Sequence, residues 1–151
     1  TYSEISRTVA LKQWDATRQL LRRVSWITTS VVVTIGSGLA LTGWFLVPFL
    51  NGGPDAAPAY PVLLILLVGY GFASIFQWNR PLLLALGKPS YPLLVSLLVG
   101  LAEIALIFGL VPLVPHFGYL VLAGIFSAYF VVSIGIIVWR GLAEITRRSA
   151  Q

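Results

Sequence analysis

Four long runs of apolar residues dominate the pattern of this chain, at residues 24–46, 61–79, 91–111 and 117–139. Each run has about the length that an α-helix needs to cross the hydrocarbon core of a bilayer. Trp26 and Trp44 bracket the first run eighteen residues apart, about 27 Å along a helix, where indole rings prefer the two membrane interfaces. The pattern predicts four transmembrane helices.

The Lys and Arg residues lie on one side of this pattern. Residues 1–23 hold five of the ten, residues 140–151 hold three, and Arg80 and Lys88 lie between the second and third runs. The loops after the first and third runs hold none. Because Lys and Arg are enriched in cytoplasmic segments, this division predicts that both ends are cytoplasmic. We expect a multi-pass protein of the cytoplasmic (inner) membrane.

Residues 1–23 mix basic and apolar side chains at roughly helical spacing. One interpretation is an amphipathic helix in the headgroup region, with its basic side toward anionic lipid. The other is a helical connector that contacts neighbouring helices. We therefore expect an all-α integral membrane protein in which a basic amphipathic interfacial helix precedes a four-helix bundle at residues 24–139. Residues 140–151 form a basic cytoplasmic tail.

The composition agrees with a bilayer protein. The 151 residues are 58% hydrophobic and 10% charged, a balance too apolar for a soluble domain of this size. A net charge of +5 would suit nucleic acid if the basic residues formed a stripe on a soluble fold, but they lie at the ends of apolar runs. We expect membrane lipid, and not nucleic acid, as a partner.

Patterns typical of catalysis or metal binding do not occur in the sequence. Cysteine is absent, which excludes disulfides and thiolate metal sites. His116 has no Cys, Asp or Glu beside it and so lacks a metal-site pattern. No nucleophile and base arrangement, phosphate-cradling loop or pair of carboxylates is recognisable. We expect no enzyme activity, no cofactor and no metal.

Small residues recur four positions apart within the apolar runs. This spacing places both members of a pair on one helix face, where they let a second helix approach closely. The predicted packing pairs are Gly36 and Ala40, Gly69 and Ala73, Ser96 and Gly100, and Ala123 and Ser127.

Glu103 is the one acidic residue within the four runs. An ionisable group at membrane depth is costly and usually faces a cavity or a partner. Glu103 shares a helix face with Ser96 and Gly100, so we expect it to point into protein. It either exchanges a proton or binds Na⁺ during a transport cycle, or it joins two helices. We favour the structural role.

A polar cluster at the end of the second run and in the segment before the third contains Gln77, Asn79, Arg80 and Lys88. In one interpretation these residues bind a phosphate or a sugar at the inner mouth of a transport path, because guanidinium groups pair bidentately with phosphate oxygens. In the other, which we favour, Arg80 and Lys88 reach the inner headgroups and set the orientation of the helices.

Three motifs carry a resemblance to a known family. Tyr2-Ser-Glu-Ile-Ser-Arg7 looks like the cytoplasmic end of a preceding helix, and Leu83-Leu-Ala-Leu-Gly-Lys88 looks like a Leu-rich, Gly-basic turn between the tenth and eleventh helices. Pro115-His-Phe-Gly118 is similar to a Pro-x-x-Gly motif before the twelfth. The chain thus resembles the C-terminal part of an oligosaccharide flippase of the multidrug/oligosaccharidyl-lipid/polysaccharide exporter superfamily. It departs at Val121-Leu122, where the family usually places Gly-Ala.

The resemblance implies a transporter of about a dozen helices in two lobes, which carries an isoprenoid-linked sugar across the membrane by alternating access. These four helices would be the last four of the second lobe. We therefore expect the chain to be part of a larger two-lobe bundle and to pack against the N-terminal helices of the same transporter.

Two other functions fit the sequence. A drug or cation antiporter of the same superfamily would share the lobe, and the lack of Lys or Arg within the four runs is compatible with a cationic substrate. A small, non-transporting membrane subunit with four helices is the second alternative.

Overall fold

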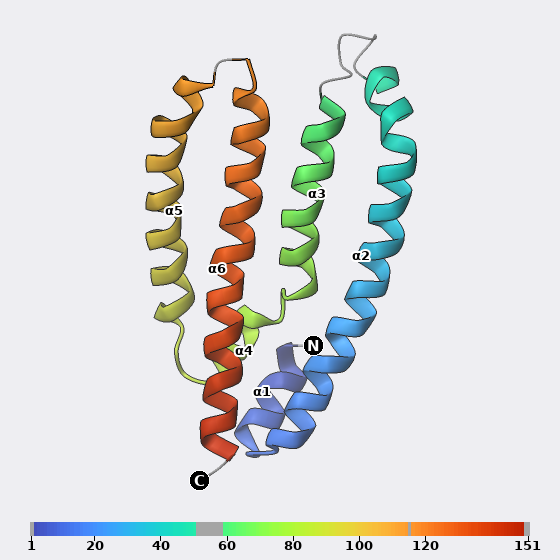
Figure 1. Cartoon of the computed structure of the whole chain (residues 1–151). Helices are drawn as coiled ribbons and strands as arrows, with labels where there is room; N and C mark the ends of the chain where they lie inside the picture. Colours follow the sequence, from blue (N-terminus) through green and yellow to red (C-terminus); the bar gives the residue numbers. More distant parts are fainter. Residues whose placement is uncertain (1, 51–58, 115, 150–151) are drawn as a thin grey trace.

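The computed structural model describes residues 2–50, 59–114 and 116–149, and every regular element in this part of the chain is helical (Figure 1). The all-α prediction is therefore confirmed. Much of the loop after the first apolar run, at residues 51–58, lies outside the described residues. The elements are α1 (Tyr2–Ala10), α2 (Trp14–Leu50), α3 (Ala59–Ile75), α4 (Asn79–Ala85), α5 (Ser90–Leu110), the short 3-10 helix η2 (Val111–Leu113) and α6 (Gly118–Ser149).

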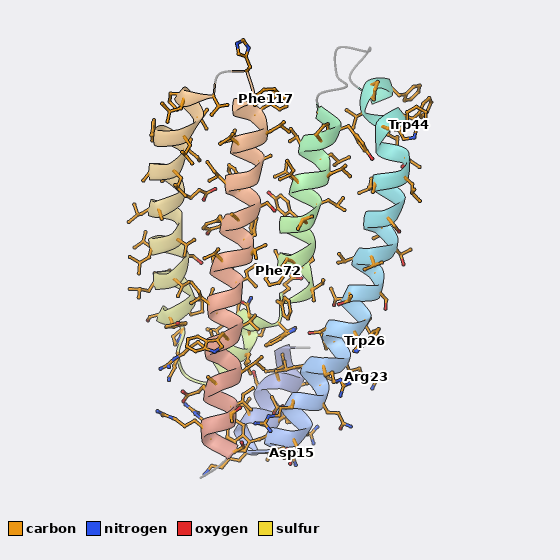
Figure 2. All side chains as sticks on the ribbon, in the orientation of Figure 1. Asp15, Arg23, Trp26, Trp44, Phe72 and Phe117 are labelled. Carbon is orange, nitrogen blue, oxygen red and sulfur yellow. The ribbon has the colours of Figure 1, made fainter. Side chains whose placement is uncertain are left out.

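Within the described residues, four helical stretches are long and apolar enough to cross a membrane, which confirms the predicted number and indicates a multi-pass membrane protein. Figure 2 shows the aromatic side chains of Trp26 and Trp44 at two levels of α2, with Arg23 beyond Trp26. The four stretches are Trp14–Phe49, Ala59–Ala85, Ser90–Leu113 and Gly118–Ser149.

The four long helices lie side by side in the order α5, α6, α3, α2 (Figure 1). α6 packs against α5 and α3, and α3 packs against α2, so α2 and α5 are the outer helices of an open row. The short helices α1 and α4 lie at one end of this row. We call it the basic end, because all ten Lys and Arg residues lie in α1, α4, the start of α2, the last ten residues of α6 and the adjoining turns.

Two helices extend beyond the boundaries predicted from hydropathy. α2 begins at Trp14 instead of residue 24, because Thr17 and Leu21 are buried on one face of its first turns. α6 continues through the predicted tail, where Glu144 and Ile145 are likewise buried. These polar turns are helical because other parts of the chain cover one of their faces, a condition that hydropathy does not register.

Residues 1–23, predicted as one interfacial helix, are divided between α1 and the beginning of α2. The break falls at Lys12, whose φ of 53° is left-handed and interrupts a right-handed helix. α1 packs on α4, and its Ile5 and Val9 side chains are buried in protein. Because protein covers this apolar side, the structure favours the connector interpretation.

The buried core lies at the basic end. It joins α1, α4 and the basic ends of α2, α5 and α6, whereas many large apolar side chains farther along the four long helices are exposed, as expected where lipid surrounds a helix. This core fixes α4, and with it the junction between α3 and α4. Its members are Ile5, Val9, Leu21, Trp78, Leu82, Leu83, Leu86, Val95, Ile137, Val138 and Ile145.

Candidate functional site

A polar cavity of about 270 Å³ lies where α3, α4, α5 and α6 meet, toward the basic end. Hydroxyl, amide and guanidinium groups line it, although the surrounding helices are strongly apolar. Its lining residues are Ala73, Ser74, Gln77, Asn79, Arg80, Ser96, Tyr129, Phe130, Ser133, Ile134 and Ile137.

A break between α3 and α4 brings three of the predicted polar residues to this cavity. α3 ends at Ile75, and the chain turns before α4 begins at Asn79. Pro81 lies in the first turn of α4, where a missing N–H is tolerated, so it permits a new helix but not a continuous one. Gln77, Asn79 and Arg80 therefore line one cavity.

Trp78 fixes the position of this break. Its side chain is only 5% exposed, and its indole Nε1 donates a hydrogen bond of 2.7 Å to Oγ of Ser25 on α2. A buried indole N–H requires such a partner. The junction of α3 and α4 is thereby attached to α2.

The opposite walls come from α5 and α6. Ser96 belongs to α5, while Tyr129 and Ser133 lie one helical turn apart on α6. The buried Ser133 hydroxyl donates a hydrogen bond of 2.6 Å to the Tyr129 carbonyl oxygen. Sequence reasoning missed Ser74, Tyr129 and Ser133 as site residues, and the four-residue spacing of the two α6 side chains was the available signal.

Arg80 provides the positive charge of the cavity. Among the described residues, no carboxylate forms an ion pair with its guanidinium and no side-chain hydrogen bond engages it. A guanidinium in this state can bind a phosphate through two parallel hydrogen bonds. The neighbouring hydroxyl and amide groups can donate to and accept from sugar hydroxyls.

Lys88 does not join the cavity with the other three polar residues. Its ammonium Nζ lies 2.9 Å from Oε2 of Glu144, which is only 3% exposed. The structure thus places Lys88, one of the candidates for an inner mouth, outside the lining of this cavity. A buried carboxylate on α6 pairs with its ammonium instead.

Glu144 forms ion pairs with several basic side chains, a role that the sequence did not indicate. Arg148 Nε donates to Oε1 of Glu144 at 3.0 Å, and Arg148 also donates to the Leu86 carbonyl oxygen at 3.1 Å. Hydrogen bonds from Lys88 and Arg148 lower the pKa of Glu144 to about 2, against the opposing effect of burial. The carboxylate thus stays ionised and holds the turn after α4 against α6, in the segment that follows the apolar run 117–139.

Glu103 lies outside the polar cavity, in a hollow of about 170 Å³ between α5 and α6. Its Oε1 atom is buried and has no hydrogen-bond partner among the described residues. Apolar side chains and Tyr129 surround it. Tyr129 lines both this hollow and the polar cavity.

The predicted packing residue Gly69 meets another of the set, Ser127, where α3 contacts α6. A methyl group at Gly69 would lie 2.7 Å from both Cα and Oγ of Ser127, so only glycine allows this approach. Gly36 approaches α3 similarly, since a Cβ there would lie 3.0 Å from Leu67 Cδ2.

The other predicted packing positions have varied surroundings. The carbonyl oxygen of Ala40 accepts a hydrogen bond of 2.7 Å from the Tyr60 hydroxyl. Gly100 faces Tyr129, and Ala123 is buried. Ala73 and Ser96 line the polar cavity instead of a tight helix contact.

No protein-family model, curated protein or solved structure matches this chain. We therefore base the function on the residues of the polar cavity and on the arrangement of the helices.

Proposed function

We propose that this chain forms part of the second lobe of a flippase that carries an isoprenoid-linked oligosaccharide across the cytoplasmic membrane by alternating access. The observation that carries the proposal is the polar cavity, in which Arg80 has no carboxylate partner among the described residues. The basic end faces the cytoplasm, in agreement with the enrichment of Lys and Arg on that side of membranes.

The chemistry of the cavity suits the headgroup of such a substrate. The anionic pyrophosphate pairs with Arg80, and this attraction is stronger in apolar surroundings than in water. The hydroxyls of Ser74 and Ser96 and the amide of Gln77 match the hydroxyls of a sugar.

The open row of helices supports a larger assembly. A volume of about 270 Å³ is slightly below the range of ordinary ligand sites, which suits part of a headgroup more than a whole oligosaccharide. In the proposal, helices of the same transporter outside this chain supply the facing wall, and the two lobes rock around the substrate.

Transport by the full-length protein in proteoliposomes tests this function. The assay follows a pyrophosphate-linked oligosaccharide as it becomes accessible to a glycosidase outside the vesicles. Arg80→Gln should lower the rate about tenfold or more, because a charge-assisted contact to the substrate is lost. Arg22→Gln is the matched control, since Arg22 is exposed and lines none of the cavities described above. Equal rates for the two variants would refute the proposal.

A drug or cation antiporter is the second candidate, and Glu103 is the observation that favours it. A carboxyl oxygen that is buried without a hydrogen-bond partner in the described chain is suited to a proton or a cationic substrate. Under this alternative, Glu103→Gln abolishes proton-driven cation uptake in vesicles. Unchanged uptake with an unchanged pH dependence would eliminate it.

A further inference from the structure

A cavity of about 630 Å³ lies between α1 and the start of α2, and we call it the α1–α2 pocket. Its volume is within the range of ordinary ligand sites. Arg7 and Arg23 line it from two different helices, together with the carboxylate of Glu4 and the amides of Gln13 and Gln19. The pocket therefore contains charges of both signs.

The turn between the two helices builds this pocket. Lys12 has a left-handed φ of 53°, and the backbone N–H of Gln13 donates a hydrogen bond of 2.9 Å to the Thr8 carbonyl oxygen. The chain reverses here, so that α2 runs back along α1 (Figure 1). The buried Ile5 of α1 and the partly buried Leu20 of α2 both pack in the core at the basic end. The fold thus fixes both walls of the pocket.

The charged groups of the pocket do not pair with one another. Glu4 and Arg7 are three positions apart on α1, a spacing at which a carboxylate and a guanidinium can meet. Nevertheless, every ion pair among the described residues involves Glu144. Neither Arg7 nor Arg23 donates a side-chain hydrogen bond to another described residue. Two guanidinium groups and one carboxylate are therefore available to a ligand.

The pocket lies at the level of lipid headgroups. Trp26 is 66% exposed on α2, as expected for an indole ring at the membrane interface. Arg23 precedes it by about 4.5 Å along the helix, and Figure 2 shows Arg23 beyond Trp26 toward the basic end. A lipid of this leaflet can place its phosphate in the pocket while its acyl chains lie along the apolar part of α2.

We propose that the α1–α2 pocket binds the headgroup of a phospholipid that carries both a phosphate and a primary ammonium, as phosphatidylethanolamine does. Arg7 and Arg23 bind the phosphate, and Glu4 pairs with the ammonium. This lipid is a bound component of the membrane and is not transported, so the inference is independent of the proposed function.

The lining of the pocket favours this headgroup over two common ones. The headgroup of phosphatidylglycerol has no cation, so it would leave Glu4 unpaired beside a negative charge. The quaternary ammonium of phosphatidylcholine is best bound by aromatic rings, and no aromatic side chain of the described residues lines the pocket.

Native mass spectrometry of the full-length protein in detergent tests the site. The delipidated protein is titrated separately with phosphatidylethanolamine, phosphatidylcholine and phosphatidylglycerol that have identical acyl chains, and the dissociation constant of the tightest site is measured. Phosphatidylethanolamine should bind about tenfold more tightly than either of the others, because it alone satisfies Glu4 as well as the two arginines.

Single substitutions locate the bound lipid. Arg7→Gln and Arg23→Gln should each weaken the binding of phosphatidylethanolamine about tenfold, because each removes a charge-assisted contact to the phosphate. Arg22→Gln is the matched control, since Arg22 is exposed, neighbours Arg23 in sequence and does not line the pocket. Thermal unfolding without lipid verifies that each variant is folded, and the two arginine variants are judged separately.

Glu4→Gln tests the choice of headgroup. It should weaken the binding of phosphatidylethanolamine about tenfold and should not weaken that of phosphatidylglycerol, because only the first lipid has an ammonium for the carboxylate. A side chain that merely supported the fold would affect both lipids alike.

Four results would overturn the inference. Equal affinities for the three lipids would show that the pocket does not select a headgroup, and tightest binding of phosphatidylglycerol would assign an anionic headgroup instead. Weakening by Arg22→Gln as large as by Arg23→Gln would indicate a general attraction to the basic end. Unchanged affinity in both Arg7→Gln and Arg23→Gln would show that the lipid binds elsewhere.

Discussion

The ammonium of Lys88 and the carboxylate of Glu144 are 2.9 Å apart, although the two residues are separated by 56 positions in the chain. Their ion pair holds the turn between α4 and α5 against α6. Arg148 strengthens the same connection through Glu144 and the Leu86 carbonyl oxygen. The basic end thereby fixes α4, and α4 carries Arg80 to the polar cavity.

Replacement of Glu144 should destabilise the protein. In Glu144→Gln, Lys88 and Arg148 lose a buried anionic partner, but each is about one third exposed and is partly resolvated. We therefore expect a loss of about 2 kcal/mol, less than for a fully buried pair. Thermal unfolding in detergent measures it. Glu4→Gln is the control, because Glu4 is exposed. If Glu144→Gln were as stable as this control, the ion pairs of Glu144 would not stabilise the fold.

The contribution of Glu144 should also depend on pH. The pKa of Glu144 is lowered from 4.5 to about 2 in the folded protein, so its stabilising effect is complete above pH 4.5 and is lost as the pH falls toward 2. The difference in unfolding temperature between the unmodified protein and Glu144→Gln should therefore be constant above about pH 5 and shrink below it. A difference that is independent of pH would show that the ion pairs do not stabilise the fold.

The contact between α3 and α6 gives a third prediction. Gly69→Ala places a methyl group 2.7 Å from the Cα of Ser127, so the two helices must separate. We expect a loss of about 2 kcal/mol, typical of overpacking. Gly38→Ala is the matched control, because a Cβ at Gly38 meets nothing within 4 Å. If both variants unfolded at the same temperature, the helices would not meet at Gly69.

Hydropathy was sufficient to predict the four long helices, because lipid-facing surfaces must be apolar along a length set by the bilayer. It could not predict that α2 begins at Trp14 or that α6 continues to Ser149. Those turns are polar and depend on contacts with α1, α4 and each other. Because of the same contacts, protein covers the Ile5 side chain of α1.

The candidate site was predictable only in part. Gln77, Asn79 and Arg80 are neighbours in sequence, so a single turn brings them together. Ser133 comes from a helix distant in sequence, and its position at the cavity depends on how α6 packs. Lys88 was a candidate for the same mouth or for the headgroups, because sequence alone does not show which distant carboxylate an ammonium will meet. Here that carboxylate is Glu144.

If the polar cavity receives the charged headgroup of the substrate, as we propose, the bound substrate should protect a cysteine in the cavity wall from labelling. Ser74 is exposed and lines the polar cavity, and this chain has no native cysteine. Ser74→Cys in the full-length protein is labelled with a membrane-impermeant thiol reagent, and the site is verified by peptide mapping. Ser90→Cys, which is exposed at the start of α5, is the control.

A pyrophosphate-linked oligosaccharide should slow labelling at position 74 about tenfold and leave labelling at position 90 unchanged, because a bound headgroup covers the cavity wall. An uncharged glycolipid should protect much less, since it lacks the group that pairs with Arg80. Labelling at position 74 that is unchanged by a substrate concentration saturating for transport would show that the headgroup does not enter this cavity.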